Sequence, residues 1–139
     1  DRRFVGEVGG LLGEYHALME KTLLRAALEK LVETSQRGNQ YLQRHQGSGE
    51  RMAHAFSVAY SLLVLLAHMC DPFLPDAAEK MYAYCGVPAG DRALPMEFRI
   101  VESAEVAEEI DVIFRPLTPE QMEALRAYDA APAAQGRRA

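Results

Sequence analysis

Residues 36–51 carry the side chains best suited to contact another molecule. Three arginines stand there against one acid, and Arg37 and Arg44 are accompanied by Tyr41 and His45. Arginines pair with backbone phosphates, and an aromatic ring or a guanidinium plane stacks on an unpaired base. This composition is typical of an RNA contact at a helix end and loop. The plain alternative is a polar helix end beside a surface loop.

The other reactive side chains do not assemble into a catalytic or metal site. His68 and Cys70 are two positions apart, which on a helix directs them to different faces, whereas helical metal ligands stand three or four apart. Glu108 and Glu109 are adjacent and fit a solvated acidic face. Cys70 and Cys85 have no partner that spacing identifies as an activating base. The sequence also has no glycine-rich phosphate loop, so we expect no catalytic residue, metal or cofactor in this chain.

The composition is that of one folded, acidic domain. The chain has 139 residues, of which 49% are hydrophobic and 25% charged, and its formal net charge is -5. This charge excludes a general nucleic-acid coat protein but allows a local basic surface. Two cysteines fit a reducing compartment. Because the sequence starts at Asp1 without an apolar leader, we expect a piece of a longer protein with no signal peptide.

Apolar residues recur every three or four positions, which is the period of an amphipathic helix. This predicts four helices, at about 4–21, 24–45, 50–71 and 75–85. The second should bury a stripe at 24, 28, 31, 35 and 42, with Gly38 allowing a neighbouring helix to come close. The third is apolar nearly all round after Phe56, so it should be central. Residues 56–70 fall short of the roughly 20 apolar residues of a membrane span, so we interpret them as a buried helix.

The predicted fold is an all-α antiparallel helical bundle over residues 1–86, with a C-terminal appendage. Residues 87–128 are rich in prolines and acids, so we expect an irregular extension whose short final helix packs back on the bundle. Thr118 and Pro119 predict the start of that helix, at about 119–127, because a hydroxyl cap and a first-turn proline favour helix initiation. Residues 129–139 are expected to be a flexible tail.

Several short segments of the sequence are informative because they occur together in one order. Residues 35–43 read Ser-Gln-Arg-Gly-Asn-Gln-Tyr-Leu-Gln, and the leucine-rich run 62–66 leads into Asp-Pro-Phe-Leu-Pro at 71–75. Three further segments are Tyr-His-Ala-Leu-Met-Glu-Lys at 15–21, Ile-Phe-Arg-Pro-Leu at 113–117 and Gln-Met-Glu-Ala-Leu-Arg at 121–126. Together they resemble the anticodon-binding domain of methionyl-tRNA synthetases, most closely the eukaryotic cytosolic branch, over most of residues 1–128.

The resemblance implies the anticodon-recognition region of a class I aminoacyl-tRNA synthetase. The full cytoplasmic enzyme would use ATP to load methionine onto its tRNA. In the family, the His-x-Gly-His-like and Lys-Met-Ser-Lys-Ser-like catalytic loops lie upstream, and neither occurs here. The implied partners are therefore methionine tRNA and an upstream catalytic domain of the same protein, with no membrane and no DNA.

The expected RNA contact lies at Arg44 and His45, with Arg37 and Asn39 in support. In the family the end of this helix leads into a Pro-Trp whose ring stacks on an anticodon base. Here Gly47 and the following serine stand in that place, and the sequence has no Trp. Asn39 lies on a different helical face from Arg44, and a packing role is its alternative.

Two further interpretations of the whole chain stay open. The missing Trp and the acidic residues 105–111 favour a non-catalytic helical protein-interaction module derived from such a domain. The second interpretation is that the chain is the same domain of a cysteinyl or leucyl synthetase. The Gly-Asn-Gln-Tyr of residues 38–41 argues against it.

Overall fold

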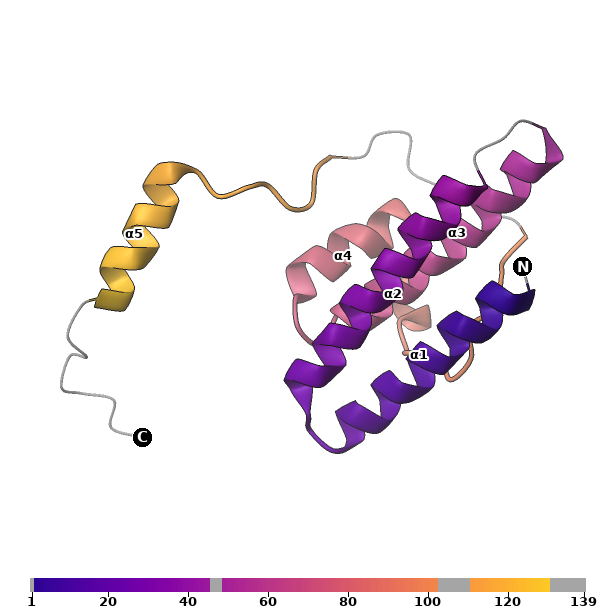
Figure 1. The fold of residues 1–139 in the computed structure, drawn as a ribbon, viewed down its shortest axis with the longest axis horizontal. Helices are drawn as coiled ribbons and strands as arrows, with labels where there is room; N and C mark the ends of the chain where they lie inside the picture. The colour runs from indigo at the N-terminus through magenta and orange to yellow at the C-terminus, as the bar shows by residue number, and fades with distance from the viewer. Residues whose placement is uncertain (1, 46–48, 103–110, 131–139) are drawn as a thin grey trace.

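Helices make up the regular elements of the part of the chain that the structure describes. The computed structural model describes residues 2–45, 49–102 and 111–130. Its elements are α1 (Arg2–Glu20), α2 (Leu24–Arg44), α3 (Glu50–Cys70), α4 (Pro75–Tyr84), the 3-10 turn η1 (Ala89–Asp91) and α5 (Pro119–Ala130). The predicted all-α fold is confirmed, and Figure 1 shows α1 to α4 gathered as a helical bundle.

Local sequence sets the ends of these helices. Pro72, which cannot donate an amide hydrogen, follows the end of α3, and Pro75 occupies the first turn of α4. Gly86 follows α4 with a φ of 64°, a left-handed conformation that glycine adopts without a Cβ penalty. A tight turn at Thr22 joins α1 to α2, and the amide of Leu23 donates to the carbonyl of Leu18 at 2.9 Å. This turn folds the start of α1 against the end of α2.

The third helix is central, as predicted. It packs against both α2 and α4, while α1 packs against α2. The buried cluster between them consists of Phe4, Val8, Leu12, Tyr15, Ala27, Tyr41, Val58, Leu62, Leu65, Leu66, Met69 and Phe98. The Tyr15 hydroxyl donates to the carbonyl of Met69 at 2.9 Å, so this buried polar atom has the partner that burial demands.

The buried face of α2 differs from the predicted stripe. Leu24 and Leu28, expected inside, are 49% and 38% exposed. The helix instead buries Ala27, Thr34, Gly38 and Tyr41. Both sets recur at helical spacing, and the face that turns inward is the one that packs against α1 and α3. Leu31 packs partly buried against the core and Gly38 is buried, as predicted, so the predicted stripe is displaced by about one position at its other residues.

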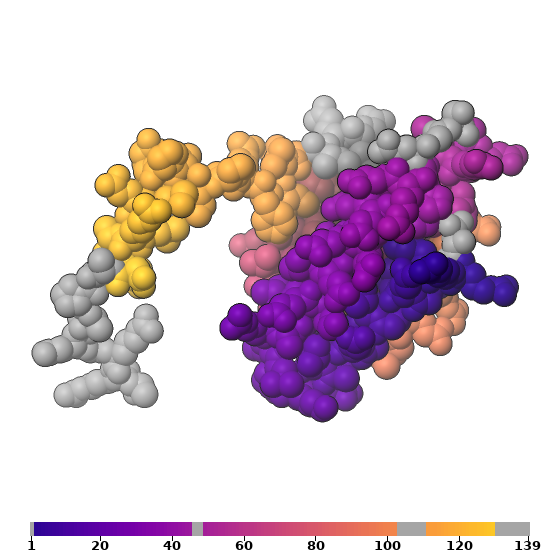
Figure 2. All heavy atoms as spheres, viewed as in Figure 1, coloured from indigo at the N-terminus to yellow at the C-terminus, as the bar shows by residue number. Residues whose placement is uncertain are grey.

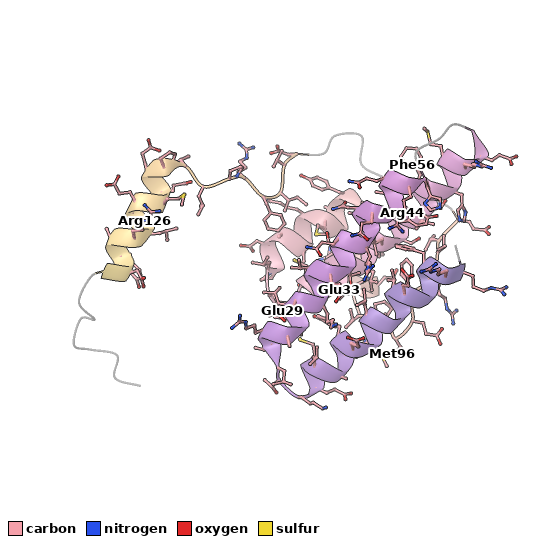
Figure 3. All side chains as sticks on the ribbon, viewed as in Figure 1. Glu29, Glu33, Arg44, Phe56, Met96 and Arg126 are labelled. Atoms are coloured by element: carbon pink, nitrogen blue, oxygen red, sulfur yellow. The ribbon has the colours of Figure 1, made fainter. Side chains whose placement is uncertain are left out.

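One side of α3 is less buried than predicted. Phe56 is 65% exposed and Leu63 is 48% exposed, and Figure 3 shows Phe56 near the end of the bundle where α3 begins. By length and composition alone α3 would suffice to cross a membrane, and half of its most apolar window is buried inside the structure. Core helices of soluble proteins meet the same criteria, and the packing of α3 between α2 and α4 is that of a core helix.

The first part of the extension covers the bundle. Phe98 is 6% exposed, within the core, with its ring edge-on to Phe4 at 6.5 Å. The amide of Val101 donates to the Ser61 hydroxyl of α3 at 2.8 Å. These contacts attach residues 87–101 to the bundle.

The final helix differs from the expectation that it packs back on the bundle. Among the described elements α5 contacts no other helix, and Figures 1 and 2 show it standing apart from the bundle. Its apolar residues Met122, Leu125 and Tyr128 are 43%, 55% and 76% exposed. The Gln121 amide donates to the Thr118 hydroxyl at 3.2 Å, a local cap that starts a helix without specifying a partner. Residues 131–139, most of the predicted flexible tail, lie outside the described residues.

Candidate nucleic-acid interface

A small pocket lies where the start of α1 meets the end of α2. Its volume is about 230 Å³. The α1 residues Arg3, Phe4 and Glu7 line it from one side. From α2 come Arg37, Gln40, Tyr41, Arg44 and His45, which share one helical face because they recur at spacings of three and four.

Three rings that line this pocket lie against one another. The rings of Phe4 and Tyr41 have centroids 4.3 Å apart and are tilted by 32°. The imidazole of His45 also stacks on Tyr41, with ring centroids 4.1 Å apart and planes 22° from parallel. Phe4 and Tyr41 are buried, whereas His45 is exposed. The stack therefore runs from the core to the surface and ends in the ring of His45.

Arginines surround the exposed end of the stack. Arg3 pairs with Glu7 at 3.0 Å, and Arg37 lies 3.7 Å from Glu33. These side chains are largely exposed, so each ion pair is worth at most about 1 kcal/mol. Such weak pairs do not prevent the guanidinium groups from binding a phosphate. Arg44 forms no ion pair with any residue that the structure describes.

The structure brings together three of the four residues predicted to bind RNA. Arg37, Arg44 and His45 line the same pocket, and their contact with RNA stays a prediction. Asn39 lies on another face of α2, outside the pocket lining. Its side chain is exposed, so it does not have the packing role that was its alternative.

Sequence reasoning missed Arg3, Phe4 and Gln40. The α1 residues could have been predicted from the tight turn at Thr22. A helical hairpin that folds at this turn sets the start of α1 against the end of α2. Gln40 follows from the spacing alone, since it lies one turn before Arg44. The loop position that the family fills with Trp falls within residues 46–48, outside the described residues.

A larger groove of about 640 Å³ along α2 is a poorer RNA site. It includes the apolar Leu28 and Val32 and the carboxylates of Glu29 and Glu33, and Figure 3 shows both carboxylates on α2, away from Arg44. Glu29 lies 3.5 Å from Arg25, so the arginines of this groove face acids on the same helix. Carboxylates repel phosphate, and no ring in the groove offers a stacking plane.

The second polar cluster of the bundle is buried. The Tyr82 hydroxyl lies 3.1 Å from Nδ1 of His68 and 3.3 Å from a carboxylate oxygen of Asp71. Burial lowers the pKa of His68 and raises that of Tyr82 to about 12, because the charged form of each loses solvation. His68 is thus a core histidine with a local partner, as predicted. Within the described ranges no three potential metal ligands gather.

Comparison with known proteins identifies the domain. The family model described as the anticodon binding domain of methionyl tRNA ligase matches residues 1–132. The chain is 30% identical over 129 residues to the probable cytoplasmic methionine–tRNA ligase of Encephalitozoon cuniculi, covering 93% of this chain and 23% of that protein. It is 26% identical to the cytoplasmic methionine–tRNA ligase of Xenopus laevis, covering 91% of this chain and 15% of that protein.

The similarity is confined to one region of each relative. The methionine–tRNA ligase of Methanopyrus kandleri is 32% identical, over 78% of this chain and 17% of its own length. The chain therefore spans less than a quarter of the length of these relatives. Because the family model covers nearly the whole sequence and the described helices form the expected bundle, this chain belongs to the family of anticodon-binding domains of methionyl-tRNA ligases.

Proposed function

We propose that this chain recognises the anticodon of methionine tRNA as the binding region of a cytoplasmic methionine–tRNA ligase. The observation that carries the proposal is the match of the family model to residues 1–132. The pocket between α1 and α2 supports it, because it combines arginines with an exposed aromatic plane. In this proposal Arg44 and His45 contact the RNA, Arg37 supports them, and Asn39 contributes from the neighbouring face.

The chemistry of aminoacylation belongs to another part of the proposed enzyme. ATP would bind to an upstream catalytic domain, and this chain itself would take no cofactor and no metal. Its partners would be methionine tRNA and that catalytic domain, and neither DNA nor a membrane is part of the proposal.

Binding of methionine tRNA at low and moderate salt tests the proposal. A double variant, Arg44→Ala with His45→Ala, should bind more weakly and show a flatter dependence of affinity on salt. Loss of one phosphate contact reduces the slope by roughly 0.7 to 0.9, because fewer counterions are released on binding.

Arg25→Ala is the matched control for charge. Arg25 is 95% exposed at the opposite end of α2, so its removal subtracts the same charge at a distance from the pocket. Equal affinity and equal salt slope for the double variant and the unaltered chain would refute these contacts.

A protein-interaction module is the second candidate function. The formal net charge of -5 and the exposed apolar side chains of α5 favour it. The two candidates differ in their response to a restored stacking residue. Installing Pro and Trp at Gly47 and Ser48 should strengthen tRNA binding if the domain recognises the anticodon, and no gain would favour the interaction module.

A further inference from the structure

The ring of His45 is held in place from several directions. Its Nδ1 lies 2.8 Å from the carbonyl oxygen of Tyr41. Because a carbonyl oxygen only accepts hydrogen bonds, Nδ1 carries the hydrogen. The backbone amide of His45 donates to the carbonyls of Tyr41 and Leu42, at 3.1 and 3.2 Å. The side chain therefore has its orientation fixed before any ligand arrives.

The support beneath this ring is rigid. Tyr41 and Phe4 are 5% and 8% exposed, and both belong to the buried cluster of the bundle. Stacking of a ligand on His45 therefore costs little conformational entropy, because the His45 side chain is already ordered. One face of the imidazole lies against Tyr41, and the exposure of the residue leaves ring surface for a second planar group.

The charges beside the ring suit one phosphate group. Arg44 directly precedes His45 as the last residue of α2, and Arg3 lines the same pocket from α1. The single carboxylate in the lining, Glu7, is paired with Arg3. The pocket, about 230 Å³, is smaller than the roughly 300–1,000 Å³ of small-molecule sites. This size suits a single base and not a pair of stacked nucleotides.

We propose that His45 is a base-stacking platform that serves in place of the absent Trp, and that the pocket takes one unpaired nucleotide of RNA. The base lies on the outer face of the imidazole, backed by Tyr41 and Phe4. Its phosphate lies between Arg44 and Arg3. The proposal rests on the proposed function and assigns the stacking role to one residue of this chain.

A pair of substitutions separates stacking from the other properties of His45. His45→Gln keeps a polar side chain but has no ring, whereas His45→Phe keeps a ring but has no polar atom. The probe is the anticodon stem-loop of methionine tRNA with 2-aminopurine in the loop, because the fluorescence of this base falls when it stacks. Affinity, salt slope and fluorescence are measured for both variants and for Arg44→Ala.

The stacking role predicts opposite results for the two variants. His45→Gln should weaken binding about 5- to 150-fold, the range equivalent to one stacked base, and should abolish the fluorescence change with an unaltered salt slope. His45→Phe should bind within a few-fold of the unaltered chain and retain the change. Arg44→Ala should flatten the salt slope by roughly 0.7 while the fluorescence change remains.

Two results would overturn the inference and leave the proposed function intact. One is unchanged affinity of His45→Gln for a stem-loop that the unaltered chain binds. The other is binding without any fluorescence change at any loop position. Failure of the unaltered chain to bind the stem-loop or the whole tRNA at low salt would contradict the inference and the proposed function together.

Discussion

Gly38 of α2 lies directly against Leu62 of α3. A Cβ atom built on Gly38 would lie 2.0 Å from Cδ2 of Leu62, well inside any permitted contact. Leu62 is 5% exposed in the middle of the core, so its side chain has little room to move away. The absent side chain at position 38 therefore sets the distance between the two helices.

Gly38→Ala should destabilise the bundle despite the better helix propensity of alanine. We expect the free energy of unfolding to fall by about 1–3 kcal/mol, the usual range for overpacking in a core. Urea denaturation followed by circular dichroism measures this difference.

Gly13→Ala is the control for that substitution. Gly13 is exposed within α1 and a Cβ there would meet no atom within 4 Å, so alanine should stabilise the helix by up to about 1 kcal/mol. Equal effects of the two changes would show that α2 and α3 do not meet at Gly38.

The buried pair of His68 and Tyr82 makes stability depend on pH. Burial lowers the pKa of His68, although the nearby Asp71 carboxylate and a backbone hydrogen bond with Arg92 oppose the shift. The folded protein thus binds the His68 proton less readily than the unfolded chain does, where the pKa is about 6.5. The contribution of neutral His68 is present above that pH and is lost as the pH falls through and below it.

Replacing His68 should reduce this loss of stability. The free energy of unfolding of the unaltered chain should drop more between pH 7.5 and pH 5.5 than that of His68→Gln, which cannot be protonated. Denaturant titrations at the two pH values give both differences, and the remaining titratable groups are common to both proteins. The same drop in both proteins would mean that His68 does not take part.

At the scale of single elements, α3 buries more residues than any other described helix. Leu65 is 2% exposed and packs between the neighbouring helices. Leu65→Ala should lower the free energy of unfolding by about 2–5 kcal/mol, because it removes buried methyl groups and leaves a cavity. The measurement is the shift of the denaturation midpoint at constant slope.

Phe56 of the same helix is the contrasting position. It is 65% exposed, so Phe56→Ala should change the free energy of unfolding much less than Leu65→Ala does. A loss of similar size at both positions would place the first turns of α3 inside the core.

Helix bounds could be predicted because local residues determine them. Pro72 and Pro75 act through their own rings and missing amides, so their effects are visible in the sequence. The buried face of α2 could not be predicted, since the stripe of Leu24 and Leu28 and the stripe of Ala27 and Thr34 fit the period equally well. Only contact with neighbouring helices chooses between two such stripes.

The candidate site was predictable in part for the same reason. Arg37, Arg44 and His45 belong to α2 and its C-cap, so helical spacing alone placed them on one face. The ring stack required Phe4 from another helix, far away in sequence, and the family resemblance pointed only to the end of α2. A tertiary contact between distant segments leaves no periodic signal in either of them.

At the scale of the whole molecule, the proposed function assigns chemistry and recognition to different domains. The relatives are four or more times longer than the region they share with this chain. We expect the isolated chain to form no methionyl-adenylate, because its sequence has no loop that would hold the ATP phosphates. Methionine-dependent exchange of pyrophosphate into ATP above the rate of a buffer blank would contradict this.

Deleting residues 119–139 tests how independent the bundle is of its final helix. Among the described elements α5 contacts no other helix, and its apolar residues are exposed. Apolar side chains that stay exposed to water add nothing to the free energy of unfolding. The truncated chain should therefore unfold at the same urea concentration, within error, as the full chain.

Phe98→Ala provides the matched comparison within the same extension. Phe98 is 6% exposed and packs edge-on against Phe4. Its truncation should lower the free energy of unfolding by about 3–5 kcal/mol, the range for a buried aromatic side chain. If deletion of α5 destabilised the bundle as much as Phe98→Ala does, α5 would pack on the bundle in solution. A neutral deletion and a costly Phe98→Ala would place the boundary of the folding unit between Val101 and α5.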